Sequence, residues 1–214
     1  MSKLELKRSE LIDRLIINYS TTENVGKLDN IVLELESHQV KGIISKAGLL
    51  GRDKHGFSWQ QIESIGKDSI IVHYDQEIEI QLDEWDTFLI GAQLWSNSGD
   101  KAGKIVDYII SQETGKVINY LFSSSGWKGI KEGIYSLAPE DILTITDKRV
   151  IADNQAIENA PQYSRGLGQS IGIVKDFIKD DYEQTLEDLK LKGKEDNTDT
   201  TEESAPITME KETD

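Results

Sequence analysis

Residues 62–71 read IESIGKDSII, and residues 142–151 read ILTITDKRVI. Isoleucine or valine occupies the same four positions in both stretches, at the first, fourth, ninth and tenth residues. A matched apolar pattern that returns after about 80 residues is typical of an internal structural repeat. We therefore expect the chain to contain two copies of one small unit.

Further matches precede this pair of stretches, in the same order along the chain. They are Leu11-Ile12 with Leu89-Ile90, Gly26-Lys27-Leu28 with Gly103-Lys104-Ile105, and Val32-Leu33 with Ile109-Ile110. Because both the order and the spacing of the apolar positions agree, chance agreement is a poor explanation.

Each copy has the sequence pattern of β-structure. Ile31, Leu33 and Leu35 alternate with Glu34 and Glu36, which places one set of side chains in a core and the other in water. Turn-forming residues separate the expected strands at 97–100 and 113–116, and a single helical turn is expected within 57–62 and 137–142. Short strands at this spacing predict small β-barrels.

The chain is expected to be organised as seven consecutive segments. They are an N-terminal extension (1–8), a first barrel (9–75), a connecting strand or linker (76–85), a second barrel (86–152), a linker (153–168), an amphipathic helix (169–191) and a disordered acidic tail (192–214). Ile78, Ile80 and Leu82 alternate in the connecting segment, so the two barrels are expected to touch and could share that strand.

The helix is predicted from one apolar stripe at helical spacing. The stripe consists of Ile171, Val174, Ile178, Tyr182, Leu186 and Leu189. Such a stripe needs a partner surface: it could pack on the second barrel, pair with a copy of itself in a homo-oligomer, or enter a groove of another protein. Its polar face is acidic, which disfavours direct binding to a membrane surface.

Charge and composition limit the classes of partner. The net charge is -15, and residues 153–214, with 7 basic and 16 acidic side chains, contribute -9 of it. This charge repels nucleic acid and anionic lipid, so we expect no direct nucleic-acid partner. The sequence has no cysteine, no apolar run long enough to span a membrane and no apolar signal core near Met1, which favours a cytoplasmic protein.

The repeated motif resembles the PRC-barrel domain. The resemblance rests on a Leu-Ile start, a Gly-Lys-Leu/Ile step into a strand, and Phe57 or Leu137 before Ile-x-x-Ile. His38 departs from the pattern, since it stands where the second copy has the turn glycine Gly115. The resemblance implies two small antiparallel β-barrels that act as docking or regulatory modules without shared catalytic residues. A tandem arrangement with an acidic tail is similar to proteins of photosynthetic bacteria, cyanobacteria especially.

The sequence gives little indication of catalytic or metal chemistry. His38, His55 and His73 are far apart and lack metal-ligand spacing, so scattered histidines are favoured over a metal site. Residues 166–172, GLGQSIG, have the wrong spacing for a dinucleotide loop and are interpreted as a hinge. We expect no cofactor and no enzyme activity, although a ligand inside a barrel remains an alternative, disfavoured because small barrels are filled by their own side chains.

Two corresponding glycine-rich loops are the candidate partner-binding sites. Residues 46–59 and 123–136 carry basic and aromatic side chains of the kind that dominates protein interfaces. The candidates are Arg52, Lys54, His55 and Trp59 in the first loop, and Trp127, Lys128, Lys131 and Tyr135 in the second. For Trp59 and Tyr135 the alternative, that they plug the barrel ends, is favoured.

The resulting hypothesis is a non-catalytic adaptor or assembly factor that docks a larger protein complex. By the resemblance, the photosynthetic apparatus is the favoured partner, with the chain in the cytoplasm or held at a photosynthetic membrane through that partner. The alternative is a role in RNA processing or ribosome maturation, because a ribosome maturation factor carries a barrel of the same family. A second barrel in place of that factor's other domain disfavours the alternative.

Overall fold

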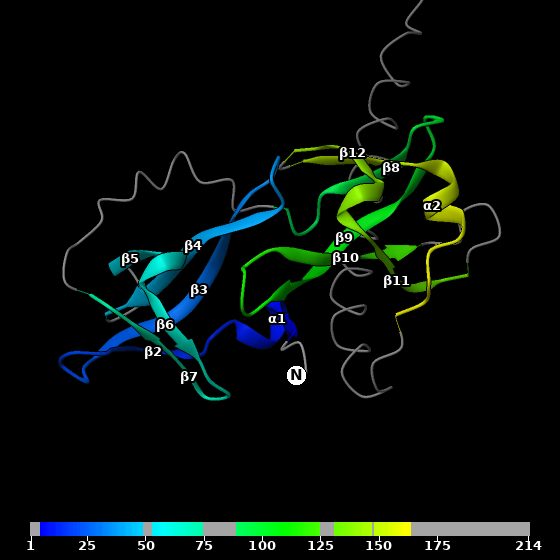
Figure 1. The fold of residues 1–214 in the computed structure, drawn as a ribbon. Coiled ribbons are helices and arrows are strands. Elements are labelled where there is room, and N and C mark those ends of the chain that lie inside the picture. The colour runs from blue at the N-terminus through cyan, green and yellow to red at the C-terminus, as the bar shows by residue number, and fades with distance from the viewer. Residues whose placement is uncertain (1–4, 49–52, 75–88, 125–130, 147, 164–214) are drawn as a thin grey trace, which may run out of the picture. The chain divides into compact units, whose positions relative to one another are not determined.

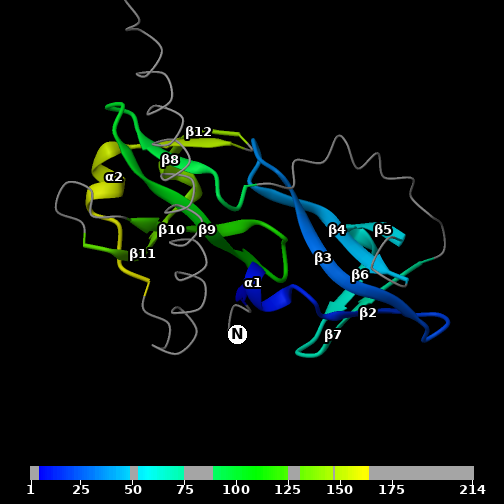
Figure 2. The ribbon, with the colours of Figure 1, turned by 180° about the vertical axis from the view of Figure 1, so that it is seen from behind.

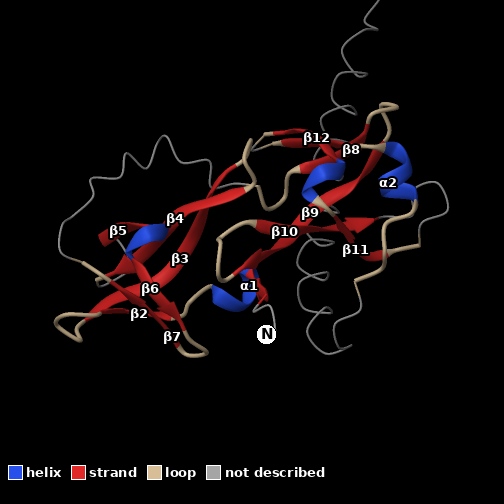
Figure 3. Cartoon of the chain, in the orientation of Figure 1, coloured by secondary structure: helices blue, strands red, loops and turns tan. Residues whose placement is uncertain are grey.

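The computed structural model describes residues 5–48, 53–74, 89–124, 131–146 and 148–163. All described residues belong to one compact unit, Met1–Ser164. Strands dominate the described residues and the helices are short (Figure 3). The expectation of a mainly β protein is therefore confirmed, whereas the predicted strand at 78–82, the helix at 169–191 and the tail at 192–214 lie outside the described residues.

The first half of the chain forms a six-stranded sheet in the order β5-β4-β3-β2-β7-β6 (Figure 1). Its elements are β2 (Leu15–Asn18), β3 (Asn24–Glu34), β4 (Gln39–Ala47), β5 (Asp53–Ser58), the 3-10 turn η1 (Trp59–Gln61), β6 (Ile62–Ile65) and β7 (Ser69–Val72).

The second half forms a sheet with the corresponding order, β11-β10-β9-β8-β13-β12. Its elements are β8 (Gln93–Ser96), β9 (Lys101–Ser111), β10 (Val117–Ser124), β11 (Gly133–Leu137), the 3-10 turn η3 (Pro139–Asp141), β12 (Ile142–Ile145), β13 (Arg149–Ala152) and then helix α2 (Asn154–Glu158). The short β1 (Glu5–Lys7) adds a seventh strand by pairing with the end of β9.

The strand registers show that the two sheets repeat one unit. Ile65 pairs with Ile70 in the first sheet, and Ile145 pairs with Val150 in the second. Both of these hairpins carry an irregularity at the same place, after Ile62 and after Ile142. The repeat expected from the matched apolar positions is thus present in the backbone.

The prediction of antiparallel barrels needs two corrections. First, β2 pairs with β7 and β8 pairs with β13 in parallel, because the chain returns to each first strand only after crossing the β3–β4–β5 or β9–β10–β11 segment. Second, neither strand path closes on itself within the described residues, since β5 and β6 end one path and β11 and β12 end the other.

The core explains why these residues form curved sheets. Alternate residues of β2, β7, β8 and β13, such as Ile16, Ile70 and Leu94, are buried, and the buried residues of both sheets form one contiguous hydrophobic cluster. Period-two alternation commits one face of these strands to the core and leaves the other face outward.

Local turn chemistry agrees with the sequence. Both expected helical turns are present as η1 and η3, with Pro139 at the start of η3, where no amide donor is needed. The turn before β4 also forms, with His38 at φ 52°, a left-handed conformation that the second sheet gives to Gly115 at φ 69°.

Candidate docking surfaces

The turns before β4 and β10 join the two sheets through reciprocal backbone hydrogen bonds. The Val40 amide donates to the Gly115 carbonyl at 2.9 Å, and the Val117 amide donates to the His38 carbonyl at 2.8 Å. His38 Nδ1 also lies 2.8 Å from the Tyr120 hydroxyl. Burial lowers the pKa of His38, which favours a neutral imidazole in this contact.

The N-terminal segment forms a second link between the sheets. Helix α1 (Arg8–Leu11) lies against β9, as the view from behind shows (Figure 2), and the Ser9 amide donates to Asp107 at 3.2 Å. Lys7 Nζ lies 3.7 Å from Asp107 in an ion pair whose side chains are 10% and 2% exposed. Burial raises the pKa of Asp107 despite these partners. On the first sheet, Arg8 donates to Asn30, which corresponds to Asp107.

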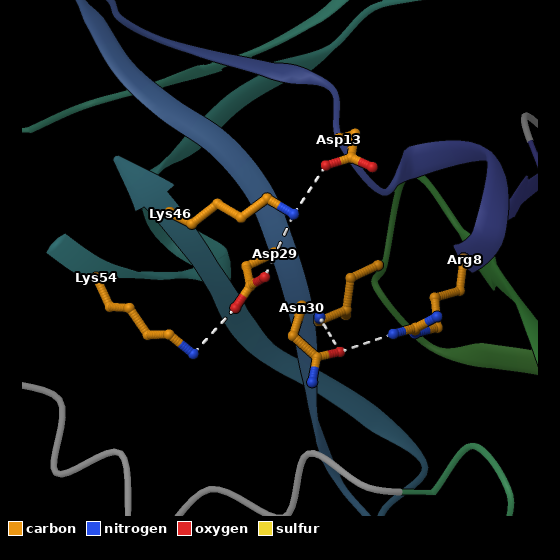
Figure 4. A network of polar contacts seen from close by, with 7 residues as sticks. Arg8, Asp13, Asp29, Asn30, Lys46 and Lys54 are labelled. Carbon is orange, nitrogen blue, oxygen red and sulfur yellow. Dashed lines mark hydrogen bonds and ion pairs between the residues drawn. The ribbon is translucent and has the colours of Figure 1, made fainter. Parts of the chain in front are cut away.

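A row of charges crosses the first sheet from strand to strand. Lys46 contacts Asp13 at 2.9 Å and Asp29 at 3.5 Å, and Lys54 contacts Asp29 at 3.1 Å (Figure 4). The hydrogen bond from Lys46 lowers the pKa of Asp13, and the same contact raises the pKa of Lys46. Because these side chains are partly exposed and satisfy one another, the row contributes little stability and offers no unbalanced charge to a ligand.

The exposed large apolar side chains lie directly after β2 in the first sheet and on β12 and β13 in the second. Among the described residues, three large apolar side chains are exposed: Tyr19 and Leu143 at 57%, and Ile151 at 37%. Tyr19 follows β2 and packs on His73 with ring centroids 4.8 Å apart. His73 Nε2 is 3.0 Å from a Glu63 carboxylate oxygen.

On the second sheet, Leu143 and Ile151 lie on neighbouring strands. Ile151 on β13 lies opposite Thr144 on β12, and Leu143 occupies the register irregularity just before Thr144. On its other side, Ile151 is paired with Trp95 of β8. Val150 and Ala152 face the core, so Arg149 and Ile151 face outward. We name Trp95, Lys101, Leu143, Arg149 and Ile151 the second outer face.

The corresponding positions of the first sheet form the first outer face, made of Ile17, Asn24, Glu63, Ser69 and Ile71. The correspondence follows from the strand registers of the two sheets. Ile17 pairs with Asn24 as Trp95 pairs with Lys101. Ser69 lies opposite Leu15 as Arg149 lies opposite Gln93. The two outer faces therefore occupy the same place on the repeated unit and differ in their side chains.

Comparison with known families finds a domain in the part of the chain that forms the first sheet. Residues 4–78 contain a PRC-barrel domain. The PRC-barrel is a protein-interaction type of domain, and its match here runs from just before β1 to just after β7. A comparison of the chain with curated proteins finds no match.

Within the PRC-barrel domain, the predicted loop residues go to different places. Lys54 belongs to the charged row, and His55 lies against Tyr74, whose hydroxyl is 3.4 Å from His55 Nδ1. Trp59 packs at the link to the second sheet, where a Cβ added to Gly115 would lie 2.7 Å from its indole. Arg52 lies outside the described residues.

In the second sheet, Tyr135 is 8% exposed and packs on Phe122, with its hydroxyl donating to the Lys131 carbonyl at 3.0 Å. The structure thus brings Lys131 and Tyr135 together, and the fold itself accounts for the position of Tyr135. Trp127 and Lys128 lie outside the described residues.

The second outer face was missed by reasoning from loops. A signal was available in the pair Val150-Ile151, because two adjacent residues of one strand cannot both face the same core. Since Val150 matches the buried Ile70, Ile151 had to face outward, and Leu143 beside it follows from the pairing of the repeat.

Proposed function

We propose that the chain is a non-catalytic adaptor that docks a larger protein complex. The observation that carries the proposal is the exposure of three large apolar side chains on the two repeated sheets: Tyr19 directly after β2, Leu143 on the edge strand β12 and Ile151 on the neighbouring strand β13. Exposed aromatic and aliphatic side chains on a rigid sheet are suited to a protein interface. The PRC-barrel domain at residues 4–78 supports the same function.

We extend the proposal to a tandem arrangement, in which the second sheet is a second PRC-barrel. Three observations support it: the strand order is the same, the parallel pair occurs at the same place, and both sheets carry the 3-10 turn before the fifth strand of the repeat.

The arrangement of ionisable groups favours binding over catalysis. The His73 and Glu63 side chains are 37% and 53% exposed, so water is not excluded from the pair they form. Asp107 is buried, and Lys7 and Ser9 enclose it. Within the described ranges, no group of three or more histidine, aspartate or glutamate side chains is placed to hold a metal ion.

The proposed partner is a complex of the photosynthetic apparatus, on the basis of the resemblance to tandem PRC-barrel proteins of photosynthetic bacteria. The proposed site of action is the cytoplasm or the surface of a photosynthetic membrane, reached through that partner. No helix of the described residues is long and apolar enough to cross a membrane. The net charge of -15 weighs against the alternative role on RNA.

Affinity isolation of the tagged full chain from its native cells, followed by mass spectrometry, tests the proposal. The expected result is enrichment of photosynthetic subunits over a tag-only control. Enrichment of ribosomal subunits would replace the proposed partner with the alternative, and enrichment of no protein would contradict the adaptor function.

A further inference from the structure

The second outer face differs from its counterpart in charge. Lys101 and Arg149 belong to it, and Lys148 precedes Arg149 in the adjoining turn. All three are exposed. They contribute a charge of +3 in a chain whose net charge is -15.

The first sheet has different residues at the same positions. Asn24, Asp68 and Ser69 stand where the second sheet has the three cations, and Glu63 stands where it has Leu143. The charge of these four positions is -2 on the first sheet and +3 on the second, and including the adjoining matched pair Lys67 and Asp147 gives -1 and +2. Two copies of one backbone thus present opposite charge at the same place.

The cations of the second sheet surround apolar side chains. In register, Lys101 is beside Trp95 and Trp95 is beside Ile151, while Arg149 lies two residues before Ile151 on the same outward side of β13. A surface that combines aliphatic side chains with cations at its margin is complementary to an amphipathic segment that carries aliphatic side chains and carboxylates.

We infer that the second outer face binds an acidic amphipathic segment of a partner protein. The inference rests on the proposed adaptor function and specifies the surface and the chemistry of the partner. A protein segment fits better than nucleic acid, because the two large side chains exposed on the face, Leu143 and Ile151, are aliphatic and Trp95 on β8 is only partly exposed, whereas bases stack on open aromatic rings. It also fits better than an anionic membrane, which the net charge of -15 repels.

A photo-cross-linking pair tests the inference in the full chain in its native cells. Leu143→p-benzoylphenylalanine places the probe on the second outer face, and Glu63→p-benzoylphenylalanine places it at the corresponding position of the first. Both positions are exposed, at 57% for the Leu143 residue and 53% for the Glu63 side chain, so both variants should fold. Circular dichroism checks this.

The probe at position 143 is expected to cross-link to protein segments rich in aspartate, glutamate and aliphatic residues, with about tenfold higher yield than the probe at position 63. Adding Arg149→Glu to the position-143 probe should lower that yield about tenfold, whereas adding Ser69→Glu should leave it unchanged. When the cross-linking is repeated in a lysate of these cells, higher ionic strength should lower the yield, as Arg149→Glu does.

Three outcomes would overturn the inference: cross-links from position 143 to nucleic acid, lipid or any segment of this chain, whether in the same or a second copy; cross-links to segments without excess carboxylates; or equal yields from both positions. If a protein complex still co-isolates with the chain in these cases, the adaptor function stands and the inference alone fails. If no protein co-isolates, both fail.

Discussion

The two sheets have the same strand order and registers, yet at three matched turns the first sheet has ordinary residues in left-handed conformations where the second has glycine. Asp13, Thr22 and His38 have positive φ in the first sheet, at 65°, 60° and 52°. The second sheet has Gly91, Gly99 and Gly115 there, at 92°, 89° and 69°. The repeated backbone therefore sets the turn conformation, and each copy occupies it with a residue suited to its own contacts.

The same contrast applies to the polar position in the middle of each long strand. Asn30 accepts from Arg8 and from the Ile31 amide, and Asp107 accepts from Ser9 and from the Tyr108 amide. The carboxylate at position 107 requires the buried Lys7, which β1 supplies by pairing with β9. The N-terminal strand thus compensates a buried charge that the first sheet avoids.

The largest predicted effect comes from breaking this pair. Lys7→Met should lower the free energy of unfolding by about 3 kcal/mol, because it leaves Asp107 buried without its cation. Urea denaturation measures the loss. The double variant Lys7→Met with Asp107→Asn, which copies the first sheet's amide, should recover most of it, and a double variant no more stable than Lys7→Met would contradict the assignment.

The pH dependence of Asp107→Asn sharpens the same point. The folded-state pKa of Asp107 is raised, so the folded protein binds a proton more tightly than the unfolded chain does. Because of this carboxyl, the free energy of unfolding of the native protein falls as pH rises from about 4 through the folded-state pKa. Relative to the native chain, the Asp107→Asn variant should be least stable near pH 4 and should become relatively more stable as pH rises. A stability difference that does not change with pH would contradict the raised pKa.

A smaller effect is expected at the link between the sheets. Gly115→Ala should destabilise the protein by about 2 kcal/mol, because alanine is strained at φ 69° and its Cβ would lie 2.7 Å from Trp59. Gly99→Ala is the matched control: φ is 89° there, and a Cβ would meet no atom within 4 Å. Thermal unfolding should show a clearly larger loss for Gly115→Ala, and equal losses would argue against Trp59 packing there.

His38 should make the link sensitive to acid. Its folded-state pKa lies below 6.5, so the unfolded chain binds the proton more readily, and stability falls as pH drops through about 6.5. His38→Asn tolerates the left-handed turn and should remove this part of the pH dependence. Tyr120→Phe, which deletes the hydroxyl contact, should cost about 1 kcal/mol at pH 7.5. A His38→Asn variant with the native pH profile would be contrary evidence.

The smallest effect should come from an exposed turn. Thr22→Gly should stabilise the protein by about 0.5 kcal/mol, since relief of the strained φ of 60° exceeds the entropy that glycine adds to the unfolded chain. Its counterpart at position 99 is already glycine. Calorimetry can detect the shift in melting temperature, and a lower melting temperature would show that Thr22 is not strained.

The repeat, the strands and both 3-10 turns could be predicted because they depend on local spacing: Ile62 and Ile65 repeat at Ile142 and Ile145, and Pro139 marks a turn start. The parallel pairing of β2 with β7 could not be predicted, because Leu15 and Ser69 are far apart in the sequence and only the folded sheet pairs them. The pairing of β1 with β9 depends likewise on contacts between residues about 100 positions apart.

The candidate site was harder to predict than the fold. Composition drew attention to loop residues such as Trp59 and Tyr135, whose large rings turn out to pack within the structure. The second outer face is recognisable only once the register places Ile151 beside Trp95 and Leu143, because each side chain taken alone resembles an ordinary strand residue.

The central claim is that the second sheet, and not the first, presents the docking surface at this shared position. The most direct measurement is the dissociation constant between the purified full chain and the partner isolated from native cells, for Arg149→Glu and Ser69→Glu. We expect about tenfold weaker binding for Arg149→Glu and native affinity for Ser69→Glu. Equal affinities for the two variants, or a loss confined to Ser69→Glu, would contradict it.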